Sequence, residues 1–188
     1  MTKVISQDFS IETARCLLRR SSVEDLPAIF EATTFLRFHD GMESEPPESI
    51  DDLYEALTEN SLAWEAGELY SFTIADRAIN SLLGRIGIHK NKRLGVWNLG
   101  FWTHPAHQGQ GYMTEATIAI IAFGFDRLDA SYIEASYSLW NKGSQRVMEK
   151  AGMKFVGYIP HAFQKQGRWI EANKMRITRQ DWLALNPS

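Results

Sequence analysis

The sequence predicts a mixed α+β fold, in which a mostly antiparallel central sheet of about seven strands is flanked by about four helices. Three strand-like runs follow one another over residues 69–103 without an intervening helix, which favours antiparallel pairing. A long helical run over 109–125 then lies between two strand-like runs, as in a β-α-β unit. With 188 residues, 44% of them apolar, the chain can bury one sizeable core. We expect a single domain over 1–188 with its core at about 11–183.

The N-terminal part is expected to contain one short strand and two helices. Cys16-Leu-Leu-Arg is a strand candidate. Ser22 followed by Asp25 is an N-cap signature, and apolar residues then recur at helical spacing, so we expect a helix over 23–34. Pro46-Pro47 is expected to open a second helix over 48–66.

The remaining elements alternate between strands and helices. The three strand-like runs are 69–75, 82–89 and 94–103, and a further strand is expected over 131–138. Asn141 is expected to cap a helix that ends at Lys150, with Gly152 as its stop signal. A closing hairpin over 154–163 and 169–177 and a short turn capped by Thr178 complete the order.

Charge is strongly segregated along the chain, although the formal net charge is only −3. Residues 77–188 carry fifteen bases and seven acids. Between Arg37 and Arg77 there is no Lys or Arg, whereas that stretch carries eleven acids. Such segregation is informative about partners, which the net charge conceals. The acids are Asp40, Glu43, Glu45, Glu48, Asp51, Asp52, Glu55, Glu59, Glu65, Glu68 and Asp76.

Composition also excludes several classes of protein. Cys16 is the only cysteine, which excludes an intrachain disulfide and a multi-cysteine metal site, and we expect no metal. The stretch Met1–Asp8 lacks the apolar core of a secretory signal, and the longest strongly apolar run, 116–125, is far below the ~20 residues of a membrane span. The basic residues are dispersed, without a stacking-aromatic motif. We therefore expect a cytoplasmic protein, monomeric or homodimeric, with no membrane or nucleic-acid partner.

One segment, Leu99 to Ala116, carries the chemistry. A strand candidate ends at Thr103, and Gly109 and Gly111 then lead into the long helix. Such a turn exposes backbone N–H groups at the positive end of the helix dipole, where a phosphate or pyrophosphate can bind. No Lys-Ser/Thr follows the glycines, and a third glycine is absent, so neither the Walker A loop nor the dinucleotide fingerprint fits. An ordinary glycine-bearing turn with no ligand stays open.

Gln108-Gly-Gln-Gly111-Tyr-Met resembles the acyl-CoA pyrophosphate loop of the GNAT N-acetyltransferases. Over about 11–183 the chain resembles the branch that contains the ribosomal-protein alanine N-acetyltransferases. Three further stretches carry this resemblance, at 13–19, 141–153 and 167–169. Met113 stands where the family usually has Gly or Ala. The resemblance implies the GNAT fold, acetyl-CoA as co-substrate, and transfer of the acetyl group directly to a primary amine.

The resemblance also implies roles for single residues. Phe101, Trp102 and Thr103 would present backbone groups to the pantetheine arm and the thioester carbonyl. Asn141 would reach the pantetheine or an ordered water, and Ser144 would protonate the leaving thiolate. Asn141 as a plain helix cap and Ser144 as an exposed residue without a role stay open. The residues expected to hold the pyrophosphate are Gln108, Gly109, Gln110, Gly111, Tyr112, Met113 and Thr114.

The general base is less evident from the sequence. Relatives place a carboxylate at positions that Asn98 and Phe163 occupy here. Two residues from Phe163, His161 would share its strand face, and a histidine titrates in the required range, so His161 is the predicted base; a surface histidine is the alternative. His89 and Glu115 are weaker candidates. Cys16 is expected to be a buried, inert thiol.

The amine acceptor is expected on the side of the two N-terminal helices and the loop between them. The resemblance places Phe35, Phe38 and His39 there, together with the acid-rich stretch. An acidic wall would attract a cationic amine, whereas a solvated helix face would attract nothing. We expect transfer to a protein or peptide N-terminal α-amine. A small cationic amine or antibiotic as acceptor, and a non-catalytic acyl-CoA-binding module, are the alternatives.

Overall fold

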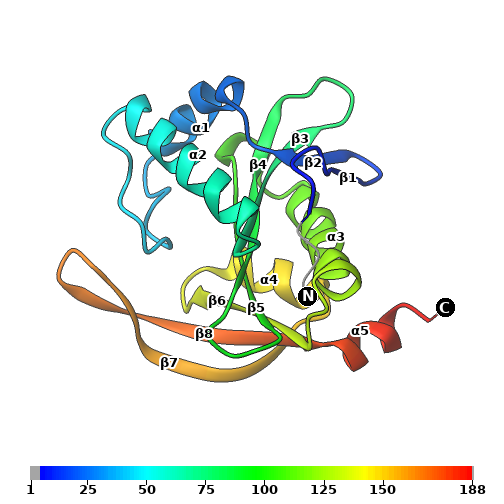
Figure 1. Cartoon of the computed structure of the whole chain (residues 1–188). Helices are drawn as coiled ribbons and strands as arrows, with labels where there is room; N and C mark the ends of the chain where they lie inside the picture. Colours follow the sequence, from blue (N-terminus) through cyan, green and yellow to red (C-terminus); the bar gives the residue numbers. More distant parts are fainter. Residues whose placement is uncertain (1–4, 188) are drawn as a thin grey trace.

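A computed structural model describes residues 5–187. Residues 1–4 and 188 lie outside the described residues. The stretch that we expect to lack a secretory signal therefore falls partly outside them. The described chain forms an eight-stranded sheet in the order β1-β2-β3-β4-β5-β6-β8-β7 (Figure 1). Every neighbouring pair is antiparallel except β5 and β6. The prediction of a mixed, mostly antiparallel sheet is therefore confirmed, with one strand and one helix more than expected.

The elements lie close to their expected positions. The strands are β1 (Ile11–Glu12), β2 (Cys16–Arg20), β3 (Leu69–Asp76), β4 (Leu82–Lys90), β5 (Val96–Thr103), β6 (Tyr132–Ser138), β7 (Lys154–Lys165) and β8 (Arg168–Thr178). The helices are α1 (Leu26–Thr33), α2 (Ile50–Glu65), α3 (Tyr112–Arg127), α4 (Lys142–Lys150) and α5 (Arg179–Leu185), with short 3-10 turns at Val23–Asp25 and Pro105–His107. None of the helices in the described part of the chain is long and apolar enough to cross a membrane.

Three helix starts differ from the prediction. The first three residues of the helix expected over 23–34 form the 3-10 turn, and α1 begins at Leu26. α2 begins at Ile50 rather than after the Pro46-Pro47 pair, because Ser49 caps it: its side chain accepts from the Asp52 N–H, and the Asp52 carboxylate accepts from the Ser49 N–H. α3 begins at Tyr112 rather than at Gly109, because Gly109 and Gly111 have φ of +75° and +85°, which no helical residue adopts.

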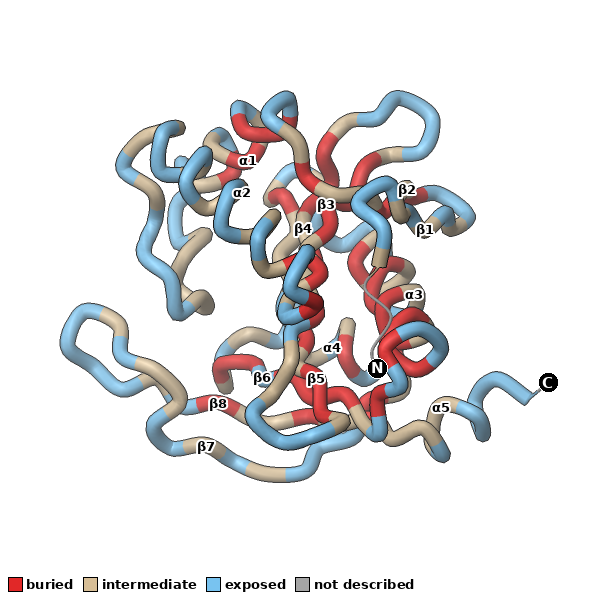
Figure 2. Tube along the Cα trace, viewed as in Figure 1, coloured by how far each residue is buried: buried red, intermediate tan, exposed pale blue. Residues whose placement is uncertain are grey.

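The helices cover both faces of the sheet (Figure 1). On one face, Phe72 of β3 and Ile88 of β4 are fully buried in the core that includes α3, and the Phe72 ring lies 5.7 Å from the Phe123 ring. On the other, α1 and α2 close a smaller cluster over β4. Buried positions run through the sheet and the inner side of α3 (Figure 2). Cys16 is fully buried on β2, and burial raises the pKa of its thiol, as expected of an inert thiol.

Strands β5 and β6 separate halfway along β5, and this separation creates the site. The two strands pair only over Val96–Asn98, which oppose Tyr132–Glu134. On its other edge β5 remains paired with β4 as far as Thr103. The edge of β5 that faces β6 therefore has no strand partner over 99–103, and its backbone groups are available to a ligand.

Candidate active site

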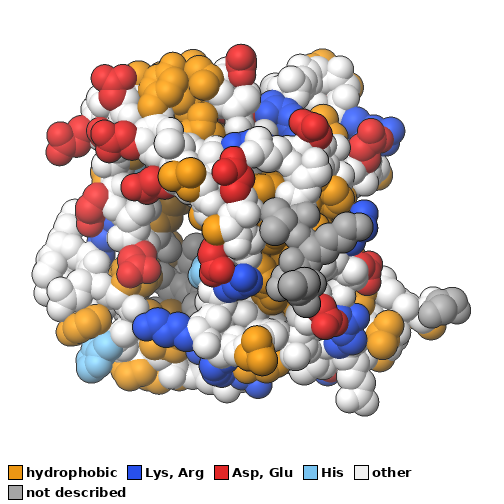
Figure 3. Space-filling view, in the orientation of Figure 1, with side chains coloured by type: hydrophobic (Ala, Val, Ile, Leu, Met, Phe, Trp, Pro, Cys, Tyr) orange, Lys and Arg blue, Asp and Glu red, His pale blue; other side chains and the backbone are white. Residues whose placement is uncertain are grey.

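A cavity of about 1010 Å³ opens where β5 and β6 separate. Its walls come from the loop after α1, from β4 and β5, from the segment 105–114, and from α4. Figure 3 shows the surface hollowed between the α1–α2 part and the β7–β8 hairpin. Within residues 5–187 no group of three or more His, Cys, Asp or Glu side chains could hold a metal ion.

The loop before α3 presents a row of free backbone N–H groups. Among the hydrogen bonds of the described residues, none uses an N–H of residues 109–114 as donor. These amides lie at the N-terminus of a sixteen-residue helix, where the helix dipole favours an anion. A Cβ built at Gly109 meets nothing, so Gly109 and Gly111 are required by their positive φ rather than by crowding. The loop fits the pyrophosphate of an acyl-CoA.

Glu115 holds this loop from behind. Its carboxylate accepts from the Thr13 hydroxyl (2.5 Å), the Arg15 N–H (2.7 Å) and Arg15 Nε (2.8 Å). Arg15 in turn donates to the Gln110 carbonyl at 3.0 Å and lies over the Tyr112 ring. Burial alone would raise the pKa of Glu115, but the bonds from Thr13 and Arg15 hold it below its ordinary value. Glu115 does not line the cavity, so it orients the loop and is not placed to act as a base.

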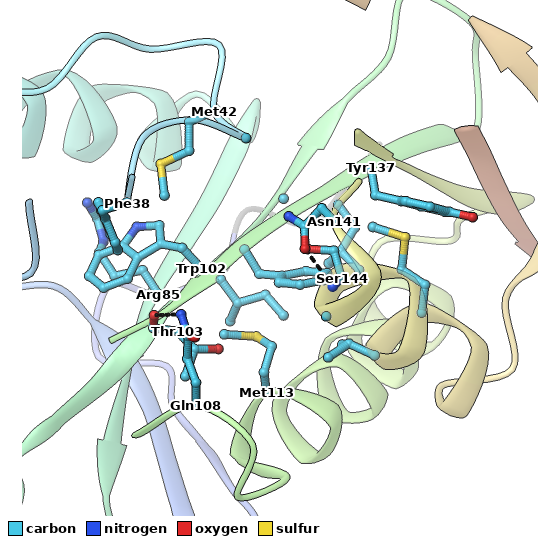
Figure 4. A pocket seen from close by; sticks show the side chains of 18 of the residues that line it. Phe38, Met42, Arg85, Trp102, Thr103, Gln108, Met113, Tyr137, Asn141 and Ser144 are labelled. Atoms are coloured by element: carbon cyan, nitrogen blue, oxygen red, sulfur yellow. Dashed lines mark hydrogen bonds between the residues drawn. The ribbon is translucent and has the colours of Figure 1, made fainter. Parts of the chain in front are cut away.

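The structure brings most of the predicted co-substrate residues together. Phe101, Trp102 and Thr103 line the cavity, as do the predicted loop residues except Gln110, whose carbonyl faces Arg15. Figure 4 shows Asn141 and Ser144 across the cavity from Trp102.

Asn141 is the N-cap of α4, since its Oδ1 accepts from the Ser144 N–H at 3.0 Å. The hydrogen bonds of the described residues leave its Nδ2 and the Ser144 hydroxyl free for a ligand.

Two basic residues on α4 were not predicted. Arg146 and Lys150 line the cavity one helical turn apart, and neither forms an ion pair within the described part of the chain. Their i, i+4 spacing on the helix that Asn141 caps was a usable sequence signal. Their charge suits the phosphates of a CoA molecule.

The acceptor side agrees with the prediction only in part. Phe35 and Phe38 line the cavity, and the Phe38 ring lies edge-on to Trp102 at 5.1 Å. His39 does not line it; both ring nitrogens are buried without a partner, and burial lowers its pKa. The loop crosses the cavity at Gly41, where a Cβ would lie 3.1 Å from the Trp140 ring.

The acid-rich stretch does not wall the cavity. None of its eleven acids is among the described residues that line it. Asp51, Asp52, Glu55 and Glu59 are exposed on α2, and Figure 3 shows Asp and Glu side chains gathered on the outer surface of this part. The side of α2 that reaches the cavity presents Asn60 instead. The interpretation as a solvated helix face fits the structure better than an acidic wall.

His161, the predicted base, lies outside the cavity. The pairing of β7 with β8 is irregular between Ile159 and Phe163, so the alternation that placed His161 on the face of Phe163 is broken. The exposed His161 ring lies 5.0 Å from Trp169 instead. His89 does line the cavity, and its Nε2 lies 3.3 Å from Nδ2 of Asn98, the position where relatives carry a carboxylate.

Comparison with known proteins agrees with this geometry. The model of the acetyltransferase (GNAT) domain family matches residues 15–154. The chain is 26% identical over 175 residues to the uncharacterized N-acetyltransferase YnaD of Bacillus subtilis, covering 92% of this chain and 98% of that protein. The chain belongs to the GNAT acetyltransferase family, and it is an acetyltransferase.

Solved structures share the fold at low sequence identity. The ribosomal L7/L12 α-N-protein acetyltransferase RimL, in complex with coenzyme A, superposes with a TM-score of 0.81 at 17% identity over 90% of this chain and 98% of that chain. The spermidine N-acetyltransferase of Vibrio cholerae, in complex with CoA and spermine, has a TM-score of 0.79 at 21% identity. The match covers 91% of this chain and 99% of that chain. These neighbours act on different amines, so the likeness identifies the fold and not the acceptor.

Proposed function

We propose that this enzyme transfers the acetyl group of acetyl-CoA directly to a primary amine, with a protein or peptide N-terminal α-amine as the expected class. The proposal depends mainly on one observation: the free edge of β5 lies in one cavity with the free amides of 109–114. The RimL and spermidine acetyltransferase structures hold CoA on the same fold, which supports it. A single catalytic domain with its core at 11–183 is part of the proposal.

The reaction needs four groups of the chain. The amides of 109–114 bind the pyrophosphate, and a free N–H of β5 near Trp102 binds the thioester carbonyl. One such donor, aimed at the developing oxyanion, contributes about 2.7–4 kcal/mol. The amine nitrogen attacks the carbonyl carbon, so that the C–N bond forms as the C–S bond breaks. The Ser144 hydroxyl supplies the proton that the leaving sulfur takes, the amine proton passes to a base, and Ser144 regains a proton through solvent as the base releases its own.

We assign the base to His89, acting directly or through a water. Its ring lines the cavity, whereas His161 and Glu115 do not. Desolvation lowers the pKa of His89 from its ordinary value, which favours the neutral imidazole that can accept a proton. We expect His89→Gln to lower kcat and to flatten the acid limb of the pH–rate profile. His161→Gln is the matched control and should leave both unchanged; the reverse result would restore His161 as the base.

The activity is tested by release of free CoA thiol from acetyl-CoA. The acceptor panel contains peptides with free and blocked α-amines, a polyamine and an aminoglycoside, and mass spectrometry checks each product for one added acetyl group. Release with free but not blocked α-amines supports the proposal. Faster release of CoA thiol with the cationic small molecules would instead identify the enzyme as a small-molecule amine acetyltransferase. Tight CoA binding without release on any amine would identify a non-catalytic acyl-CoA-binding module.

A further inference from the structure

The formal charge that lines the cavity is entirely basic. Among the described residues, the lining includes Arg37, Arg85, Arg146 and Lys150 but no Asp or Glu. Arg146 and Lys150 belong to α4, on the side of the co-substrate. Arg37 has its own counter-ion, because its Nε lies 2.7 Å from the Asp40 carboxylate. Arg85 is therefore the charge to be explained on the acceptor side.

Arg85 is a largely buried guanidinium with little compensation. It lies on β4 opposite Trp102 of β5, and its Nη2 donates to the Ser71 hydroxyl at 2.9 Å. Its Nε is closed off from solvent and has no hydrogen-bond partner. A guanidinium keeps its charge in a protein, and a buried charge is costly unless it is paired. The Nη1 of Arg85 forms no hydrogen bond within the described chain and is not closed off, so it is a free donor of a residue that lines the large cavity.

No carboxylate of the described chain forms an ion pair with Arg85. Asp25 is the acid whose charge acts on Arg85, but it forms its own ion pair with Arg19 and further hydrogen bonds. Arg19 donates to both of them at 2.8 Å, and the Ser22 N–H and the Thr73 hydroxyl donate to Oδ2 at 2.9 and 3.0 Å. No hydrogen bond or ion pair of the described chain joins Arg85 to Asp25.

The space behind Arg85 is too small to hold a counter-ion. Asn60, Ser71 and Arg85 line a second cavity of only about 10 Å³, which has room for one water at most. Arg20 lines it as well, which adds positive charge there. The same three residues line the large cavity, so an anion can reach the guanidinium only from that side.

We infer that Arg85 binds a carboxylate of the acceptor, so that this enzyme acetylates amines that carry a carboxylate close to the amino group. The inference rests on the proposed function and names its substrate class. Guanidinium donors match the two oxygens of a carboxylate, and Asn60 and Ser71 offer further polar contacts. Phe38 and Trp102, which Figure 4 shows near Arg85, form an apolar wall beside it. A free amino acid and a peptide with an acidic first residue share this chemistry.

The test compares acceptors that differ only by a carboxylate. One pair is a free amino acid and its carboxamide; the other is a C-terminally amidated peptide that begins with Glu or with Gln. We expect kcat/KM to be about 10- to 100-fold higher for the acid of at least one pair, and the pair that responds identifies the source. Arg85→Gln should abolish this preference and leave the rate on the carboxamide within a few fold. Arg77→Gln, in an exposed ion pair with Glu12 away from the cavity, is the matched control.

Thermal unfolding provides a readout that does not depend on turnover. The acid of the responding pair, added with CoA, should raise the Tm of the wild-type protein but not that of Arg85→Gln. Without ligand, Arg85→Gln should unfold at the wild-type Tm or higher, because it removes an uncompensated buried charge. A large loss of Tm, equal rates on acids and carboxamides, or weakened CoA binding in Arg85→Gln would overturn the inference. Absent turnover together with an Arg85-dependent Tm shift would instead contradict the proposed function alone.

Discussion

Glu134 joins three parts of the chain at the point where β5 and β6 separate, and its removal should destabilise the protein strongly. It faces Asn98 in the last residue pair between the two strands. Its side chain is only 3% exposed and accepts from Arg93, in the loop before β5, and from Arg176 of β8 at 2.6 and 3.0 Å, with Lys174 at 3.7 Å. The perturbation is Glu134→Gln, which keeps the shape and removes the charge.

The expected loss follows from this burial. Breaking a buried ion pair costs about 3–5 kcal/mol. Because Arg93 and Arg176 keep 50% and 33% exposure and can regain water, we expect about 3 kcal/mol. For a chain of this size that corresponds to a Tm lower by about 6–12 °C. The matched control is Glu68→Gln, whose single ion pair with Lys90 is exposed and should contribute less than about 1 kcal/mol.

The contribution of Glu134 to the free energy of unfolding should decrease as the pH falls. Burial alone would raise the pKa of Glu134, but Arg176, Lys174 and Arg93 hold it below the ordinary 4.5. Since the folded pKa is depressed, the contribution is complete above pH 4.5 and disappears as the pH falls through the folded value. Urea unfolding at pH 7 and at about pH 3 should show the wild-type and Glu134→Gln free energies converging in acid. A difference below about 1 kcal/mol at pH 7, or one independent of pH, would refute this reasoning.

Two further changes test the co-substrate side of the site. Gly111→Ala forces a left-handed backbone on alanine at about 1–2 kcal/mol, and we expect a CoA dissociation constant about ten-fold higher by calorimetry. Gly157→Ala, at an open position outside the cavity, is its control, and equal affinities would show that the loop does not bind CoA. Replacing Arg146 and Lys150 together by Gln should weaken CoA binding and flatten its dependence on salt between about 50 and 300 mM. An unchanged salt dependence would place the CoA phosphates elsewhere.

Much of the fold followed from short-range signals that do not depend on tertiary contacts. The capping pairs Ser22–Asp25 and Thr178–Asp181 lie where the sequence indicated them, because a cap bonds within one helical turn. The two glycines of the loop before α3 were recognisable because positive φ favours glycine wherever it occurs. These local features indicated helix starts and the anion loop, whereas the family was indicated by the resemblance of whole motifs.

His161 does not line the cavity, because strand alternation holds only while pairing stays regular, and β7 is irregular between Ile159 and Phe163. The expectation that the acid-rich stretch walls the cavity is not met by the described residues, for a related reason. A run of acids in sequence does not say which side of a helix faces a cavity, and α2 directs these side chains to solvent.

The sequence by itself determined the class of protein, the position of the pyrophosphate loop and the charge segregation, because each depends on residues close together in the chain. Only the tertiary structure decided the character of the acceptor side. In the sequence Arg85 is one of fifteen bases in the C-terminal two thirds. Its significance arises because Asp25 is bonded to Arg19, Ser22 and Thr73, and Arg85 beside the cavity is left without an ion-pair partner in the described chain. Whether a buried charge has a partner depends on contacts between distant segments, and only the folded chain shows them.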